Sequence, residues 1–131
     1  MSFDSFFRQY LETALWSSTD ESDERGGEHF DKNYSVSDIA PSSLKHLRKE
    51  AKRFYDEYGD KWTDDGQAGH DFWLTRNRHG AGFWDREEMY GGKANAGFLT
   101  EASQKFGEED LHLDDKGRIR AAYETVTRRS R

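Results

Sequence analysis

Residues 69–86 read GHDFWLTRNRHGAGFWDR and form the most chemically dense part of the chain. The segment holds two histidines, two aspartates, three arginines and two Phe-Trp pairs. Residues 70–76 are rich in strand formers, residues 77–82 are typical of a turn, and residues 83–86 can return as a partner strand. The segment therefore predicts a β-hairpin in which Trp73 and Trp84 lie on facing strands and pack together.

Two amphipathic helices are expected before this segment. Apolar residues recur at three- and four-residue steps over residues 3–16, which is the pattern of a helix with one buried face. A second apolar stripe begins near Pro41, the only proline of the chain, and ends near Gly59. Proline is favoured in the first turn of a helix and glycine at its C-terminal cap, so both residues fit the ends of this second helix.

A third helix and a second hairpin are expected after the segment. The helix is capped by Asn95 or a neighbour and ends at Gly107. Residues 109–113 and 118–123 alternate like strands, and residues 114–117 form a tight turn between them. The expected order is α-α-β-β-α-β-β, which is an α+β fold with a small antiparallel sheet packed against helices, in a single domain over residues 1–131.

The composition favours a small protein with an aromatic core. The chain has 131 residues, no cysteine and a net charge of −6. It has no apolar run long enough for a transmembrane helix and no secretory signal at its start, so we expect a cytoplasmic protein without disulfides or a membrane partner. Aliphatic residues are scarce, but 15% of the residues are aromatic. Because each ring buries about 150–250 Å², rings can build the core.

All of the net negative charge lies before residue 66, and it is densest between residues 20 and 38. Such a patch can repel DNA, mimic it, or bind a basic protein surface. Alternatively, it is a solvated, mobile loop over about residues 17–35, since segments rich in charge and poor in apolar residues often stay mobile. The basic tail, residues 128–131, is expected to fray. The acidic candidates for binding are Asp20, Glu21, Asp23, Glu24, Glu28 and Asp31.

Four residues of the 69–86 segment are candidates for chemistry, namely His70, Asp71, His79 and Asp85. Imidazole and carboxylate suit zinc or iron(II), but the spacing of the two histidines matches no local metal motif. His79 can act as a general base that Asp85 orients. On a strand, His70 and Asp71 would point to opposite faces, so they could not easily act together.

The alternative for these residues is structural, because both aspartates can pair with Arg76, Arg78 or Arg86. We therefore assign no catalytic residue, no metal and no cofactor from the sequence.

The same segment can also bind single-stranded nucleic acid. Bases would stack on Trp73 and Trp84, while Arg76 and Arg78 would contact phosphates. The net charge of −6 disfavours this function, because nucleic-acid-binding proteins are usually basic.

Residues 69–86 resemble the core of a family of small, mostly uncharacterised proteins encoded by bacteriophages and by prophage regions of bacterial genomes. The family pattern reads GHDFWLTRNGHGAGFWDR, and the chain departs from it at Arg78, where the family usually has glycine. This departure argues against a turn that needs a positive φ at residue 78. The resemblance continues more weakly over residues 10–16, 38–54 and 106–117.

The resemblance implies no particular activity, but it favours a phage accessory protein. We expect a non-enzymatic protein that binds a host protein in the host cytoplasm, for counter-defence or host takeover, with the acidic region as a contact or DNA-mimicking surface. One alternative is a small hydrolase or metal-dependent enzyme centred on His70, Asp71, His79 and Asp85. The other is nucleic-acid binding through the hairpin of residues 70–86.

Overall fold

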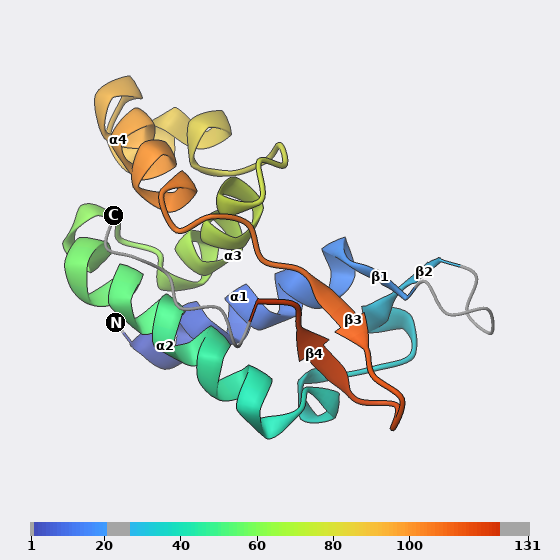
Figure 1. Ribbon diagram of the computed structural model, residues 1–131. Coiled ribbons are helices and arrows are strands. Elements are labelled where there is room, and N and C mark those ends of the chain that lie inside the picture. The colour runs from blue at the N-terminus through green and yellow to red at the C-terminus, as the bar shows by residue number, and fades with distance from the viewer. Residues whose placement is uncertain (1, 21–26, 124–131) are drawn as a thin grey trace.

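The computed structural model describes residues 2–20 and 27–123. The α-helices of this part are α1 (Phe3–Ser17), α2 (Pro41–Tyr58), α3 (Asp65–Arg76) and α4 (Lys93–Gln104). The strands are β1 (Thr19–Asp20), β2 (Glu28–His29), β3 (Leu111–Leu113) and β4 (Ile119–Ala121), and the 3-10 helices are η1 (Phe30–Lys32), η2 (Val36–Asp38), η3 (Gly59–Lys61) and η4 (Phe83–Tyr90). Helix α4 lies at one end of the molecule and the two hairpins lie toward the other (Figure 1). The α+β class is confirmed.

The first two helices form where the apolar stripes predict them. Ser2 caps α1, because its hydroxyl accepts a hydrogen bond of 3.2 Å from the Ser5 backbone N–H. Pro41 occupies the first turn of α2, and Gly59 is its C-terminal cap. The last predicted helix also forms, but it begins at Lys93 with Gly92 as the cap. The Asn95 side chain instead donates to the carbonyl of Tyr90.

The predicted hairpin over residues 70–86 is wrong, and the order of elements is wrong there with it. Residues 70–76 belong to α3, and residues 83–86 begin η4. Asp64 caps α3, because its carboxylate accepts a hydrogen bond of 3.0 Å from the Gln67 backbone N–H. Helix α3 is buried on nearly every side, and a short buried helix has the same apolar pattern as a buried strand.

Gly69 allows α3 to pack directly against α1. A β-carbon at this position would overlap the carbonyl oxygen of Phe6. The two helix backbones can therefore approach closely, and α3 lies in the centre of the fold beside α1 (Figure 1). This close approach explains why α3 is buried so completely.

The core consists mainly of stacked rings, as the composition predicts. The rings of Phe54 on α2 and Phe72 on α3 are stacked with their centroids 4.0 Å apart. Phe6 of α1 stacks on Phe72 at 6.1 Å and on Trp62 at 5.5 Å. Aromatic contacts thus join the first three α-helices, and each such pair contributes about 0.5–1.5 kcal/mol beyond the burial of its surface.

The closing hairpin is confirmed, with Leu111 of β3 opposite Ala121 of β4. Strand β4 is fixed to the start of α2, because Ala40 donates its backbone N–H to the Ile119 carbonyl at 2.8 Å. The interval 17–35, expected as a loop, contains the short hairpin β1–β2 and η1. The strands thus form two separate two-stranded sheets. The basic tail lies outside the described residues.

None of the helices in the described ranges combines the length and the apolar character needed to cross a membrane.

Candidate functional site

Asp71 is completely buried on α3 and joins that helix to η4. Its Oδ1 accepts hydrogen bonds from Gln67 Nε2 at 2.9 Å and from Arg86 Nε at 3.1 Å, and it lies 2.9 Å from His70 Nδ1. Its Oδ2 accepts a hydrogen bond of 2.6 Å from the Tyr90 hydroxyl. Burial, with the nearby Asp71 carboxylate as a second cause, raises the pKa of Tyr90. Two of these partners lie on η4, so the first role of Asp71 is structural.

The expectation that His70 and Asp71 cannot act together is wrong, because it assumed a strand. On α3 the His70 ring contacts the carboxylate of the next residue. The ring also lies 6.0 Å, between centroids, from the half-exposed Trp16 of α1.

The turn between α3 and η4 uses Asp85 as a structural residue. The Asp85 Oδ2 accepts a hydrogen bond of 2.6 Å from the Ala81 backbone N–H. Thr75 Oγ1 accepts one of 3.1 Å from the Phe83 N–H, and a β-carbon on Gly82 would overlap this hydroxyl oxygen. Within the described ranges, no hydrogen bond joins Asp85 to the exposed His79 ring. The sequence-based His79–Asp85 pair is therefore not formed.

Arg78 adopts a φ of 60°. The arginine at a position where the family pattern has glycine argued against a positive φ, and this expectation is wrong. The side chains of Arg78 and His79 are exposed. Trp84 is 47% exposed and packs beside Gly97 and under the Lys93 ammonium, whereas Trp73 is buried, and no ring contact joins these two described tryptophans. The predicted contact between the two tryptophans is thus absent.

Arg76 is completely buried, so it cannot contribute to a nucleic-acid surface. Its Nη1 donates to Glu50 Oε1 at 2.8 Å and to the Tyr10 hydroxyl at 3.0 Å. Its Nε and Nη2 donate to the carbonyls of Gly107 at 2.8 Å and Phe106 at 3.2 Å. Burial raises the pKa of Tyr10 to about 12. Arg76 thus ties α1, α2 and the chain after α4 to α3.

Beside Arg76 lies a group that the sequence analysis missed. His46 Nε2 lies 2.9 Å from Glu109 Oε2 and 3.7 Å from Glu50 Oε1. His46 and Glu50 are four residues apart on α2, so a shared helix face was predictable. Glu109 lies far away in the sequence, and only the fold brings it to this position.

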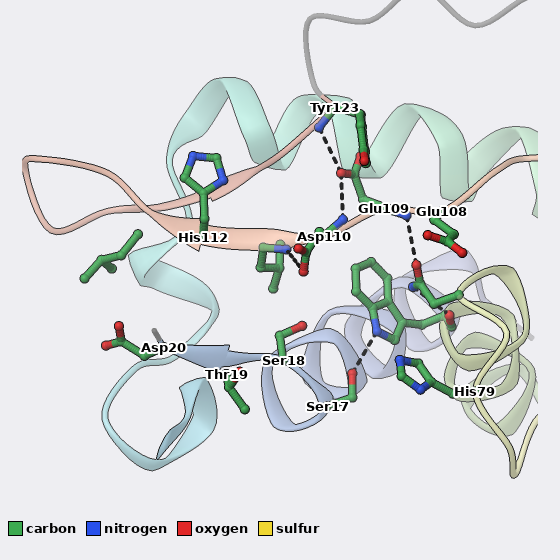
Figure 2. A pocket seen from close by; sticks show the side chains of 14 residues that line it. Ser17, Ser18, Thr19, Asp20, His79, Glu108, Glu109, Asp110, His112 and Tyr123 are labelled. Atoms are coloured by element: carbon green, nitrogen blue, oxygen red, sulfur yellow. Dashed lines mark hydrogen bonds between the residues drawn. The ribbon is translucent and has the colours of Figure 1, made fainter. Parts of the chain in front are cut away.

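A groove with a volume of about 720 Å³ opens beside the closing hairpin (Figure 2). Three parts of the chain line the groove. They are residues 17–20 at the end of α1, the residues Trp73, Asn77 and His79 in the last turn of α3 and just after it, and residues 108–113 together with Tyr123. Trp73 donates to the Ser17 hydroxyl at 2.8 Å, and Glu109 donates its backbone N–H to the Asn77 side chain at 2.9 Å. These bonds fix the walls of the groove relative to each other.

The charged residues of the groove are predominantly acidic. Asp20, Glu108, Glu109 and Asp110 line it, and none of the described residues that line it is a lysine or an arginine. Glu108 and Asp110 are exposed, whereas Glu109 is buried. Figure 2 shows the labelled acidic residues on both sides of the groove, on the β1 segment and on the segment leading into β3. The arrangement can attract a cationic group.

The other acidic candidates are spread over several places. Glu28 lies opposite Asp20 in the β1–β2 hairpin and pairs with Lys32 at 2.7 Å. Asp31 lines a different groove, with a volume of about 510 Å³, between α1 and residues 34–37. Glu21, Asp23 and Glu24 lie outside the described residues. Of the acidic stretch, the structure therefore places Asp20 in the groove.

Comparisons with protein-family models, with curated proteins and with solved structures found no match to this chain.

Proposed function

We propose that the chain is a non-enzymatic binding protein whose groove takes a basic segment of a partner protein. The observation that carries this proposal is the acidic lining of the groove, where Glu108 and Asp110 are exposed and none of the described lining residues is a lysine or an arginine. Complementary charge speeds association and selects the partner. A partner segment that bears arginine or lysine is therefore the favoured ligand.

The size of the groove supports the same proposal. Its volume of about 720 Å³ lies within the range of about 300–1,000 Å³ that is typical of ligand sites. Such a space accommodates a few side chains of an extended segment. Tyr123 is exposed at the rim of the groove, where its ring can contact the aliphatic stem or the cation of an arginine.

The sequence that follows Asp20 carries further negative charge. Glu21, Asp23 and Glu24 directly follow Asp20 in the chain. Together with the resemblance to phage proteins, this favours a host protein in the host cytoplasm as the partner. Counter-defence or host takeover, through an acidic surface that competes with DNA for a basic site, is the role we propose.

Charge neutralisation tests this function. The double variant Glu108→Gln/Asp110→Asn removes two charges from the groove, and the asparagine keeps an oxygen that can accept the Leu111 N–H as Asp110 does. We expect its affinity for a labelled arginine-glycine peptide, measured by fluorescence anisotropy at low ionic strength, to fall about tenfold, since each exposed charge contributes up to about 1 kcal/mol. Binding of the wild type should also weaken as salt is added.

The matched control is Glu88→Gln/Glu101→Gln, which makes the same change in net charge on exposed residues of η4 and α4. We expect it to bind the peptide as the wild type does. Equal losses in the two double variants would mean that only the net charge matters, and the groove would lose its assigned role.

A second candidate function is acid–base catalysis at His70. The observation that favours it is the 2.9 Å contact between His70 Nδ1 and the buried Asp71, since a carboxylate in this position orients an imidazole. Turnover of nitrophenyl esters or phosphates that is lost in His70→Gln, with unchanged thermal stability, would support an enzyme. Absence of turnover with these substrates leaves binding as the favoured function.

A further inference from the structure

We propose that His46, Glu50 and Glu109 form a binding site for one divalent transition-metal ion of the zinc type. The ligand atoms that these three residues offer lie within 4.8 Å of one another. This inference does not depend on the proposed function of the groove: of the three residues only Glu109 also lines the groove, and the site is argued from the distances between the three ligand atoms.

The distances between the donor atoms suit a metal ion. In a tetrahedral site, bonds of about 2.0–2.2 Å from zinc to nitrogen and oxygen place neighbouring ligand atoms roughly 3.3–3.6 Å apart. The separations of His46 Nε2 from Glu109 Oε2, 2.9 Å, and from Glu50 Oε1, 3.7 Å, lie on either side of this range. The third separation, between the Glu50 and Glu109 oxygens, is at most 4.8 Å, so side-chain rotations that bring the two carboxylates together would place all three donors around one ion. One imidazole and two carboxylates form a donor set that zinc accepts.

The surrounding hydrogen bonds orient the two carboxylates. Glu109 Oε1 accepts the backbone N–H groups of Asp110 at 2.9 Å and Tyr123 at 3.0 Å, while its Oε2 faces His46. Glu50 accepts a hydrogen bond from Arg76, and a carboxylate still offers further lone pairs to a metal. Such outer partners fix ligand orientation in metal sites. His46 and Glu50 also lie four residues apart on α2, on one face of a rigid helix.

The charges of the cluster favour a second cation. The cluster contains two buried carboxylates, those of Glu50 and Glu109, and Glu50 pairs with the buried guanidinium of Arg76, which also donates to the Tyr10 hydroxyl. A cation bound between these carboxylates would offset part of the cost of burying them. The His46 side chain is 13% exposed, which gives an ion a path from solvent.

Isothermal titration with zinc chloride tests the proposal on the full chain. We expect one saturable site per chain, a higher Tm in the presence of zinc, and visible absorption bands when Co²⁺ replaces zinc. His46→Gln keeps an N–H that can donate to Glu109 but removes the imidazole ligand. We expect this variant to fold, to lose at least about tenfold in zinc affinity, and to lose the zinc-dependent rise in Tm.

The control is His29→Gln on β2, because His29 is an exposed histidine that belongs neither to the cluster nor to the residues lining the groove. Its zinc affinity and its stabilisation by zinc should match those of the wild type. The proposal is overturned if the wild type binds no zinc. It is equally overturned if zinc binds but His46→Gln leaves the affinity unchanged.

Discussion

Arg78 and Ala81 have left-handed backbones, with φ of 60° and 67°, in the turn that joins α3 to η4. A left-handed conformation is costly for residues with a β-carbon, and glycine avoids this cost. The surrounding turn holds them in place, since Asp85 accepts the Ala81 N–H and Thr75 accepts the Phe83 N–H. The side chain of Arg78 is exposed, so its conformation is imposed by the backbone around it.

Replacing Arg78 with glycine should therefore stabilise the protein. The left-handed backbone costs about 1–2 kcal/mol, and the greater freedom of glycine in the unfolded chain offsets about 0.5–1 kcal/mol of the gain. We expect Arg78→Gly to raise the free energy of unfolding by about 0.5–1 kcal/mol, measured by urea denaturation. Arg78→Ala removes the charge but keeps the β-carbon, so it should give no such gain. A stabilisation of equal size in both variants would assign the effect to charge.

At the scale of elements, the close approach of α3 to α1 positions α3, and the hydrogen bonds of Asp114 shape the turn of the closing hairpin. Gly69 brings α3 against the Phe6 carbonyl of α1. Asp114 closes the β3–β4 turn, because its Oδ1 accepts the backbone N–H groups of Lys116 and Arg118, each at 2.9 Å. Its Oδ2 accepts a hydrogen bond of 2.9 Å from Arg120 Nε.

The packing of α3 on α1 can be tested with two glycines of the same helix. Gly69→Ala forces a methyl group into the Phe6 carbonyl, so we expect it to lower the free energy of unfolding by about 1–3 kcal/mol. A β-carbon on Gly66 would have its nearest neighbour, the Asp64 carboxylate, at 3.6 Å. Gly66→Ala should be neutral or stabilising by up to about 1 kcal/mol. Thermal or urea denaturation of both variants measures this difference. Equal changes in stability for Gly69→Ala and Gly66→Ala would refute the packing argument.

The β3–β4 turn should depend on pH through Asp114. The hydrogen bond from the Arg118 backbone, followed by that from the Arg120 side chain, lowers the pKa of Asp114 from 3.8 to about 2. Because the folded state lowers this pKa, the carboxylate stabilises the fold above pH about 4, and this contribution is lost as the pH falls toward 2. We expect Asp114→Asn to have a lower urea midpoint than the wild type at pH 7. The difference should shrink between pH 4 and pH 2, and a difference that stays constant would contradict the assignment.

At the scale of the whole molecule, buried polar side chains join elements that are far apart in the sequence. Arg76 connects α3 to Tyr10 of α1 and to Glu50 of α2, and Asp71 connects α3 to Tyr90 of η4. Removing one partner of such a buried ionic network leaves another charge uncompensated. The polar residues of α3 therefore hold the three-dimensional arrangement of the helices.

Ionisation of Tyr10 reports on this arrangement directly. Burial raises its pKa from 10.0 to about 12. Because the folded state raises this pKa, the resulting stability is present below pH about 10 and is lost as the pH rises toward 12. The measurement is the tyrosinate absorbance of the wild type minus that of Tyr10→Phe as a function of pH. We expect this difference to show no ionisation of Tyr10 near pH 10. A difference spectrum that develops with a midpoint near 10 would mean that Tyr10 is accessible to solvent.

The sequence predicted the elements with clear periodicity and failed where burial hides periodicity. The stripes of α1 and α2 and the alternation of β3 and β4 have one buried face, so their patterns are readable. Helix α3 is buried almost all round, and its Phe72-Trp73-Leu74 run could not be distinguished from a strand. The groove could not be predicted either, because residues that are distant in the sequence form its walls. Asp20 was identified from its charge, but Glu108 and Asp110 reach the groove only through the closing hairpin.

The most direct test of the binding function is a chemical-shift titration of the ¹⁵N-labelled chain with the arginine-glycine peptide. We expect shift changes concentrated on residues 17–20, on His79 and on residues 108–113, because these line the groove. The changes should be lost in Glu108→Gln/Asp110→Asn and retained in Glu88→Gln/Glu101→Gln. Shift changes centred on another face of the molecule, or none at saturating peptide, would contradict the proposal that the acidic groove binds a basic segment.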